Sequence, residues 1–152
     1  MRALIQRVSE AKVVANGELT GSIGPGYVIL LGVAEQDTAE IAARMWHKIF
    51  QLRIFQDDEG KTNRSLSDVA GEVLIVSQFT LYADLRKGNR PSFIRAGSPA
   101  HSEALYNNFV QLAKADLGDV ATGIFGADMQ ISLTNDGPFT IWLDSDIWNT
   151  PR

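Results

Sequence analysis

The chain has 152 residues and a net charge of −4 at pH 7, and this length suits one domain, residues 1–152, with a sizeable buried core. Because it contains no cysteine, disulfides, thiolate zinc sites and cysteine nucleophiles are excluded, and a reducing, cytoplasmic location is expected. The acidic balance argues against a protein that coats nucleic acid, and the apolar runs are far shorter than the roughly 20 residues of a membrane helix.

The first part of the chain predicts a β-hairpin and then a central strand. Residues 3–8 begin a strand, and Asn16-Gly17 separates two short β-prone runs. Asn-Gly is the strongest local hairpin signal, because a type I′ turn requires positive φ at both central residues. After a Gly-Pro-Gly break, residues 27–33 are almost entirely apolar. Such a run is typical of a strand in the middle of a sheet.

Two amphipathic helices are expected. Apolar residues recur at helical spacing over 41–52, with Asp37 or Thr38 as the cap. Ser98-Pro99 supplies a cap and a first-turn proline for the second helix, which ends near Gly118. Both histidines of the chain fall on these helices, without a second ligand type at metal spacing. We therefore expect packing or surface histidines and no metal site.

A second apolar run, residues 73–76, ends abruptly in polar side chains. Four aliphatic residues in a row predict a buried strand, and Ser77, Gln78 and Thr80 follow where this strand leaves the core. Strand ends are places where a rigid scaffold meets solvent, so these residues are candidates for chemistry. The alternative is a turn whose side chains satisfy their own backbone.

A basic loop follows the polar strand end. Between Leu85 and Ser102 there is no acid, and there are four cations, namely Arg86, Lys87, Arg90 and Arg95. This loop could bind a phosphate backbone, with Phe93 or Tyr82 offering a ring on which a base stacks. The alternative is a loop that is only solvated.

The last third of the chain returns to strands. Segments 121–125, 129–134 and 139–143 are β-prone, and a turn over 135–138 separates the last two. The predicted fold is therefore an α/β, β-rich layered domain with the order β-β-(β-α)-(β-α)-β-β-β and two helices packed on a β body. The tail 144–152, a frayed end or an interface strap, is left unassigned.

The motifs of several familiar chemistries are missing. The chain has no G-x-S-x-G elbow, no H-E-x-x-H, no Walker loop and no G-x-G-x-x-G. An enzyme of this composition has to rely on backbone donors, hydroxyl groups and groups of its substrate. That apparatus suits hydrolysis of an activated ester and does not suit amide hydrolysis.

Six segments of the chain closely resemble one known family, the D-aminoacyl-tRNA deacylases, formerly called D-tyrosyl-tRNA deacylases. In order along the chain they are residues 1–8, 21–33, 77–81, 90–93, 125–129 and 135–140. The resemblance extends from residue 1 to about residue 143. It implies a cytoplasmic homodimer that cleaves the ester between a D-amino acid and tRNA. It implies no metal or organic cofactor, and neither DNA nor a membrane as a partner.

The resemblance also implies roles for individual residues. Ser77, Gln78, Phe79 and Thr80 would form the catalytic motif. Gly137-Pro138, with a cis peptide, would enter the pocket of the other subunit. Arg7 would brace that loop. The residues bordering the terminal adenosine would be Phe125, Ala127 and Met129.

These roles suggest a mechanism and a basis for selectivity. Backbone N–H groups of Phe79 and Thr80 would form an oxyanion hole, and the ribose 2′-hydroxyl of the tRNA would assist the attacking water. A wall at Gly137-Pro138 would exclude L side chains, so glycyl-tRNA is expected to be a substrate as well. Two alternatives stay open: an esterase with Thr80 as nucleophile, and a non-enzymatic RNA-binding module.

Overall fold

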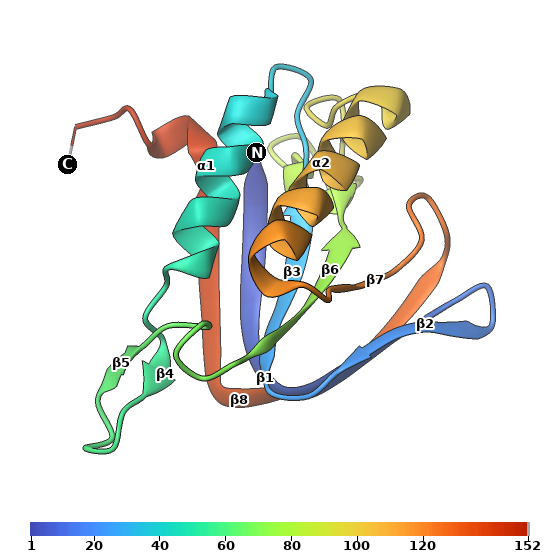
Figure 1. Ribbon diagram of the computed structural model, residues 1–152. Helices are drawn as coiled ribbons and strands as arrows, with labels where there is room; N and C mark the ends of the chain where they lie inside the picture. The colour runs from blue at the N-terminus through green and yellow to red at the C-terminus, as the bar shows by residue number, and fades with distance from the viewer. Residues whose placement is uncertain (152) are drawn as a thin grey trace.

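A strongly curved, mixed sheet forms the body of the protein, and the computed structural model describes residues 1–151 (Figure 1). Its six strands run in the order β2-β1-β3-β6-β7, with β8 paired to the other side of β1. Their bounds are β1 Arg2–Ala15, β2 Glu18–Ile23, β3 Gly26–Gly32, β6 Glu72–Ser77, β7 Ala121–Thr122 and β8 Met129–Asp144. Gly21 of β2 lies against Ala121 and Thr122 of β7. The sheet therefore curls until it is nearly closed.

The predicted hairpin is confirmed, and β1 is longer than expected. Asn16 and Gly17 have φ values of 52° and 81°, as a type I′ turn requires. The first half of β1 pairs with β3 and its second half pairs with β2, while β8 pairs along both halves. One long strand thus joins all the antiparallel parts of the sheet.

The apolar strand β3 is central, as predicted. It lies antiparallel to β1 and parallel to β6, and all but one of its residues are buried. Its carboxyl end and that of β6 lie at the same edge of the sheet, since the two strands are parallel. A separate small hairpin, β4 Phe55–Gln56 and β5 Thr62–Arg64, lies away from this edge (Figure 1).

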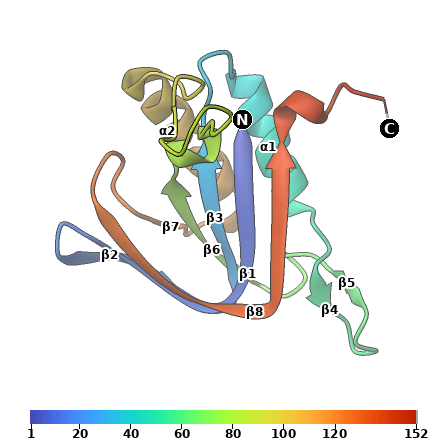
Figure 2. The same ribbon diagram turned by 180° about the vertical axis from the view of Figure 1, so that it is seen from behind.

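The two predicted helices, α1 Ala39–Phe50 and α2 Pro99–Leu117, cover one face of the sheet, as the views from the front and from behind show (Figures 1 and 2). Thr38 caps α1, because its Oγ1 accepts the N–H of Ile41 at 3.3 Å. The Ser98 side chain makes no such bond at the start of α2. Its backbone N–H donates instead to the carboxylate of Glu35 at 2.6 Å.

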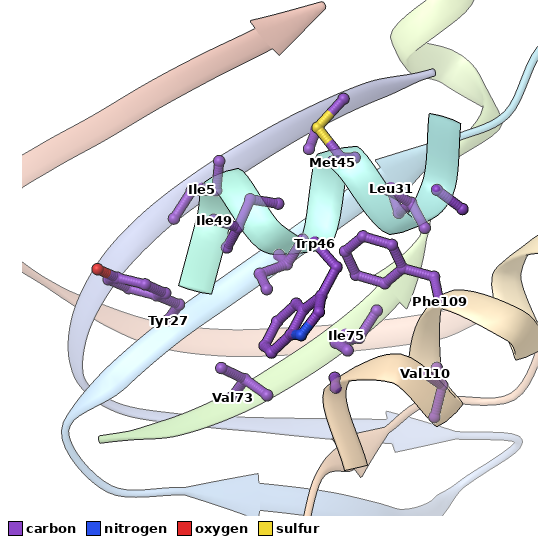
Figure 3. Packing of buried hydrophobic residues seen from close by; sticks show 14 of the residues in the cluster. Ile5, Tyr27, Leu31, Met45, Trp46, Ile49, Val73, Ile75, Phe109 and Val110 are labelled. Atoms are coloured by element: carbon purple, nitrogen blue, oxygen red, sulfur yellow. The ribbon is translucent and has the colours of Figure 1, made fainter. Parts of the chain in front are cut away.

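The core lies between the helices and the sheet (Figure 3). Met45, Trp46 and Ile49 of α1 are buried against the strands. The Trp46 ring meets Phe109 of α2 edge-on with 5.7 Å between the ring centroids, and its indole N–H donates to Asp116 of α2 at 2.8 Å. Each large apolar side chain buried here contributes roughly 1.5–3 kcal/mol to folding. α2 is therefore held against α1, and residues of both helices share one core with the strands.

The prediction of two final strands with a turn between them was wrong. β8 is one strand of 16 residues, although its register against β1 shifts in the middle. While β1 runs from Val8 to Gln6, β8 runs from Asn135 to Thr140, so three extra residues bulge out. The turn-forming residues are accommodated as a bulge because β1 is long enough to pair on both sides of them. The segment 123–125, also predicted as strand, belongs to a loop.

The end of the described chain packs on the body. A short 3₁₀ helix, η2 Ser145–Ile147, follows β8. Asp144 accepts from Arg2 at 2.9 Å, and the guanidinium of Arg44 lies 4.7 Å from the centroid of the Trp148 ring. The first part of the unassigned tail, residues 144–148, thus contacts the body, and Arg152 lies outside the described residues. Within residues 1–151, no helix has the length and apolar character needed to cross a membrane.

Candidate active site

A pocket of about 580 Å³ lies where β3 and β6 end. Its walls are mostly apolar and come from these two strands, from α2 and from the loop before β8. Seven residues singled out in the sequence line it: Ser77, Gln78, Phe79, Phe93, Phe125, Ala127 and Met129. Pockets of about 300–1,000 Å³ are typical of small-molecule sites. The fold therefore brings together two segments that are almost 50 residues apart in the sequence.

The polar strand end of β6 forms one side of the pocket. Gln78 is fixed by its backbone N–H, which donates to the Leu31 carbonyl at 2.8 Å. Its side-chain amide donates to the hydroxyl of Thr80. Thr80 itself is exposed and is not among the residues lining the pocket. The structure thus places Ser77 and Gln78 at the pocket, whereas Thr80 is outside the lining and is hydrogen-bonded to Gln78.

Phe79 and Thr80 begin the 3₁₀ helix η1, Phe79–Tyr82. The first N–H groups of a helix have no partner inside it. Among the turn and loop hydrogen bonds of residues 1–151, neither of these two N–H groups is a donor. Two adjacent backbone donors are therefore free, the first of them on Phe79, which lines the pocket, and such donors can stabilise negative charge on an oxygen atom.

Of the two rings expected to stack a base, Phe93 and Tyr82, only one is available at the pocket. Phe79 is 56% exposed, and its ring meets Phe93 edge-on with 5.0 Å between centroids. Tyr82 is only 1% exposed, with the Arg2 guanidinium 4.5 Å from its ring centroid. Burial raises the pKa of the Tyr82 phenol. The expectation that Tyr82 could stack a base was therefore wrong, whereas Phe93 lies at the pocket.

Two residues of α2 that the sequence did not single out, Ser102 and Tyr106, also line the pocket. The Tyr106 hydroxyl donates to the Ile75 carbonyl at 2.8 Å, and burial raises the pKa of this phenol to about 12. It is a structural hydroxyl and stays protonated at neutral pH. The sequence signal that could have pointed to Ser102 and Tyr106 is their helical spacing with Phe109, which marks the face of α2 that points to the sheet.

The cations of the basic loop divide into two pairs. Arg86 binds Asp84 at 2.5 Å, and its guanidinium lowers the pKa of that carboxyl to about 2. Arg95 lies 3.6 Å from Asp146. Lys87 and Arg90 are exposed and have no ion pair with any described residue. Asp84 directly precedes the acid-free segment from Leu85 to Ser102, and Asp146 lies far beyond it in the sequence, so the effective positive charge of the loop is smaller than expected.

Gly137 and Pro138 lie in the bulge of β8 and are exposed, and the peptide bond between them is cis. Arg7, buried in β1, holds this bulge. Its Nε donates to the Asp136 carbonyl at 2.9 Å, and its guanidinium lies 4.8 Å from the Phe139 ring centroid. None of the described residues from 135 to 140 lines the pocket of the same chain.

The donor set of the described residues contains no group of three or more His, Asp or Glu side chains placed to hold a metal ion. The polar groups that the pocket offers are hydroxyls, the amide of Gln78, the exposed carboxylate of Asp128 and free backbone N–H groups. This set can orient an ester and stabilise its tetrahedral intermediate.

Comparisons with known proteins agree with this geometry. The family model of D-Tyr-tRNA(Tyr) deacylase matches residues 4–144. The chain is 55% identical over 152 residues to the D-aminoacyl-tRNA deacylase of Dehalococcoides mccartyi, covering 100% of this chain and 99% of the relative. It is 54% identical over 145 residues to that of Thermomicrobium roseum, covering 95% and 94%.

Solved structures share the fold. The structure titled c-Myc DNA unwinding element binding protein superposes with a TM-score of 0.90 at 40% identity, covering 95% of this chain and 99% of that one. A probable eukaryotic D-amino acid tRNA deacylase, only 18% identical, has a TM-score of 0.82 over 93% and 97% of the two chains. The chain therefore belongs to the D-aminoacyl-tRNA deacylase family, and it is a hydrolase.

Proposed function

We propose that this protein hydrolyses the ester bond of D-aminoacyl-tRNA, releasing the free D-amino acid and tRNA. One observation carries the proposal: in a member of this family, the polar end of β6 and two free backbone N–H groups meet at the edge of an apolar pocket. The pocket accommodates the 3′-terminal nucleoside against Phe125, Ala127 and Met129. With tRNA as substrate and no cysteine in the chain, we also propose a cytoplasmic location.

The chemical step is assigned to backbone donors and the substrate. Water attacks the ester carbonyl, and the N–H groups of Phe79 and Thr80 stabilise the oxyanion. Losing one such donor costs roughly 3–4 kcal/mol of transition-state stabilisation. The vicinal 2′-hydroxyl of the terminal ribose takes part in proton transfer from water to the leaving 3′-oxygen. Ser77 and Gln78 position the ester, since both line the pocket.

A two-fold homodimer would complete the site. Gly137 and Pro138 are exposed and do not line the pocket of their own chain. In a two-fold dimer each subunit can insert the same segment into the other, which builds two composite sites. Arg7 supports this arrangement, because it fixes the Asp136 carbonyl and packs on Phe139.

Chirality is then selected by exclusion. The inserted Gly137-Pro138 segment occupies the space that an L side chain would need, and its carbonyls accept from the substrate ammonium. A filter of this kind passes any substrate without an L side chain. The enzyme is expected to hydrolyse D-aminoacyl-tRNA and glycyl-tRNA, to spare L-aminoacyl-tRNA and to tolerate many D side chains.

The test is hydrolysis of one tRNA charged with a D-amino acid, its L-enantiomer or glycine, with Gln78→Ala as the site variant. Hydrolysis of the D and glycyl esters, weakened in the variant, is the expected result. Turnover of none of them would support a non-enzymatic RNA-binding module. Hydrolysis of the D ester with glycyl-tRNA spared at high enzyme would show a cavity for D side chains and would refute exclusion.

The basic loop is expected to bind the tRNA backbone mainly through Lys87 and Arg90, because Arg86 and Arg95 already have acidic partners. For a single strand, each lost phosphate contact reduces the slope of log K against log salt concentration by about 0.7. Lys87→Ala with Arg90→Ala should therefore weaken binding and reduce the slope by about 1.4, while the single-turnover rate at saturation is unchanged.

The matched control for this measurement is Arg86→Ala with Arg95→Ala, which removes the same formal charge from paired positions. It should change the salt slope less. Equal slopes for wild type and the Lys87, Arg90 variant would show that the tRNA backbone lies elsewhere on the surface.

A further inference from the structure

Ser102 is a polar residue in an otherwise apolar part of the pocket. It lies in the second turn of α2 and is 8% exposed. Its backbone N–H donates to the Ser98 carbonyl at 2.9 Å as part of the helix. None of the side-chain hydrogen bonds among residues 1–151 involves its hydroxyl, and this oxygen is not one of the fully buried atoms without a partner, so it stays accessible on a residue that lines the pocket. A hydroxyl has one donor and two acceptor sites, so this one is available to hydrogen-bond a ligand or water in the pocket.

Gly97 fixes where this hydroxyl lies. A Cβ built on Gly97 would come within 2.9 Å of Ser102 Oγ and within 3.3 Å of the Ala34 carbonyl oxygen. The absence of a side chain at this position therefore leaves room for the hydroxyl. Both residues line the pocket, so the hydroxyl lies at the pocket wall beside the Gly97 α-carbon.

The surroundings suit a flat aromatic ring. Val33, Tyr106 and Phe125 line the same pocket, and the Tyr106 hydroxyl is already bonded to Ile75. The other lining polar side chains are Ser77 and Gln78, to which the ester is assigned, and the exposed Asp128. RNA ends are commonly recognised by stacking of the base on aromatic rings together with hydrogen bonds to its edge.

We propose that the Ser102 hydroxyl hydrogen-bonds one polar atom on the edge of the 3′-terminal adenine and thereby makes the pocket selective for that base. The proposal deepens the proposed function and rests on it for the identity of the substrate. Ser102 acts as a specificity residue for the nucleoside and takes no part in bond breaking.

The test uses free adenosine and four analogues that each lack one polar group of the base: purine riboside and 1-, 3- and 7-deazaadenosine. Binding to wild type and Ser102→Ala is followed by NMR titration. Wild type should bind one analogue about 3- to 10-fold more weakly than adenosine, the range expected for one hydrogen bond. Ser102→Ala should bind adenosine weaker by the same factor and should no longer distinguish that analogue.

Asn107→Ala, on the exposed side of α2, is the matched control and should bind adenosine as wild type does. Ser102→Cys, which replaces the hydroxyl by a poor hydrogen-bonding group, is the second variant should Ser102→Ala fail to fold. The proposal is overturned if wild type does not bind adenosine or binds all four analogues as tightly as adenosine. It is also overturned if each analogue loses the same affinity relative to adenosine in wild type and in the Ser102 variants.

Hydrolysis separates this proposal from the proposed function. With D-aminoacyl-tRNA, Ser102→Ala should raise KM about 3- to 10-fold at an unchanged kcat. Ser102-dependent adenosine binding by a wild type that does not hydrolyse this substrate would overturn the proposed function and support the base-reading role. Normal hydrolysis with KM and adenosine binding independent of Ser102 would overturn the base-reading role alone.

Discussion

Replacing the terminal 2′-hydroxyl of the tRNA by hydrogen is expected to slow hydrolysis of the D-aminoacyl ester by about 100-fold or more, the usual contribution of a group that transfers protons. Thr80→Ala is expected to keep its activity within about tenfold, the effect of one lost hydrogen bond. In the structure the Thr80 hydroxyl accepts a hydrogen bond from the Gln78 side-chain amide. No described histidine or carboxylate is hydrogen-bonded to it as a base.

Single-turnover hydrolysis with saturating enzyme measures both effects directly, because it separates chemistry from product release. Thr80→Ser, which keeps the hydroxyl, is the matched control. An inactive Thr80→Ala that still folds and binds tRNA, together with an active Thr80→Ser and a trapped acyl ester on wild type, would identify Thr80 as a nucleophile. The substrate-assisted mechanism would then be wrong.

Local signals in the sequence were sufficient for most of the fold. Asn16-Gly17 defined the hairpin because positive φ at two successive positions is a local requirement. The strands at β3 and β6 followed from unbroken apolar runs, and the α1 helix followed from its period and from Thr38. In each case the information lies within about ten residues of the element that it specifies.

The error at β8 had a long-range cause. Asn135 to Pro138 has the composition of a turn, and in an isolated segment it would end a strand. Here β1 pairs with β8 on both sides of the segment, so it bulges and the strand continues. The bulge therefore depends on pairing between residues more than 120 positions apart, and a short stretch of sequence does not contain this information.

The site was only partly visible for the same reason. Ser77 and Gln78 could be found because they end a strand, whereas Ser102 looks like any small residue on the inner face of a helix. Its role becomes apparent only when the fold places Gly97 and the pocket beside its hydroxyl. The charge of the basic loop was overestimated because Asp84 and Asp146 lie outside the loop in sequence and beside it in space.

Gly137→Ala is expected to lower kcat/KM for D-aminoacyl-tRNA by about 100-fold or more while the protein still folds. Gly137 has a φ of +126°, and a Cβ there would lie 2.9 Å from Arg7 Nη2 and 3.2 Å from the Phe139 N atom. Displacing the bulge would remove the segment assigned to the partner's pocket, and a misplaced positioning group typically costs about 100-fold in rate.

Gly60→Ala is the matched control, since Gly60 has a φ of +76° but nothing within 4 Å of the added Cβ. It should lose comparable stability and retain activity, and equal activity of both variants would show that the bulge plays no part in the site.

Mixing two weak variants tests whether the site is shared between subunits. Gly137→Ala carries its defect in the inserted segment, and Gln78→Ala carries its defect in the pocket. In a two-fold dimer with composite sites, each mixed dimer has one site with both defects and one site with neither. Unfolding and refolding an equimolar mixture should therefore restore about a quarter of wild-type activity, since half of the dimers are mixed and each has one intact site. Gly137→Ala mixed with a Gly137→Ala, Gln78→Ala double variant is the control and should restore nothing. Activity no higher than the mean of the two variants would mean that each subunit builds its site alone, because every site in the mixture would then carry the defect of its own chain.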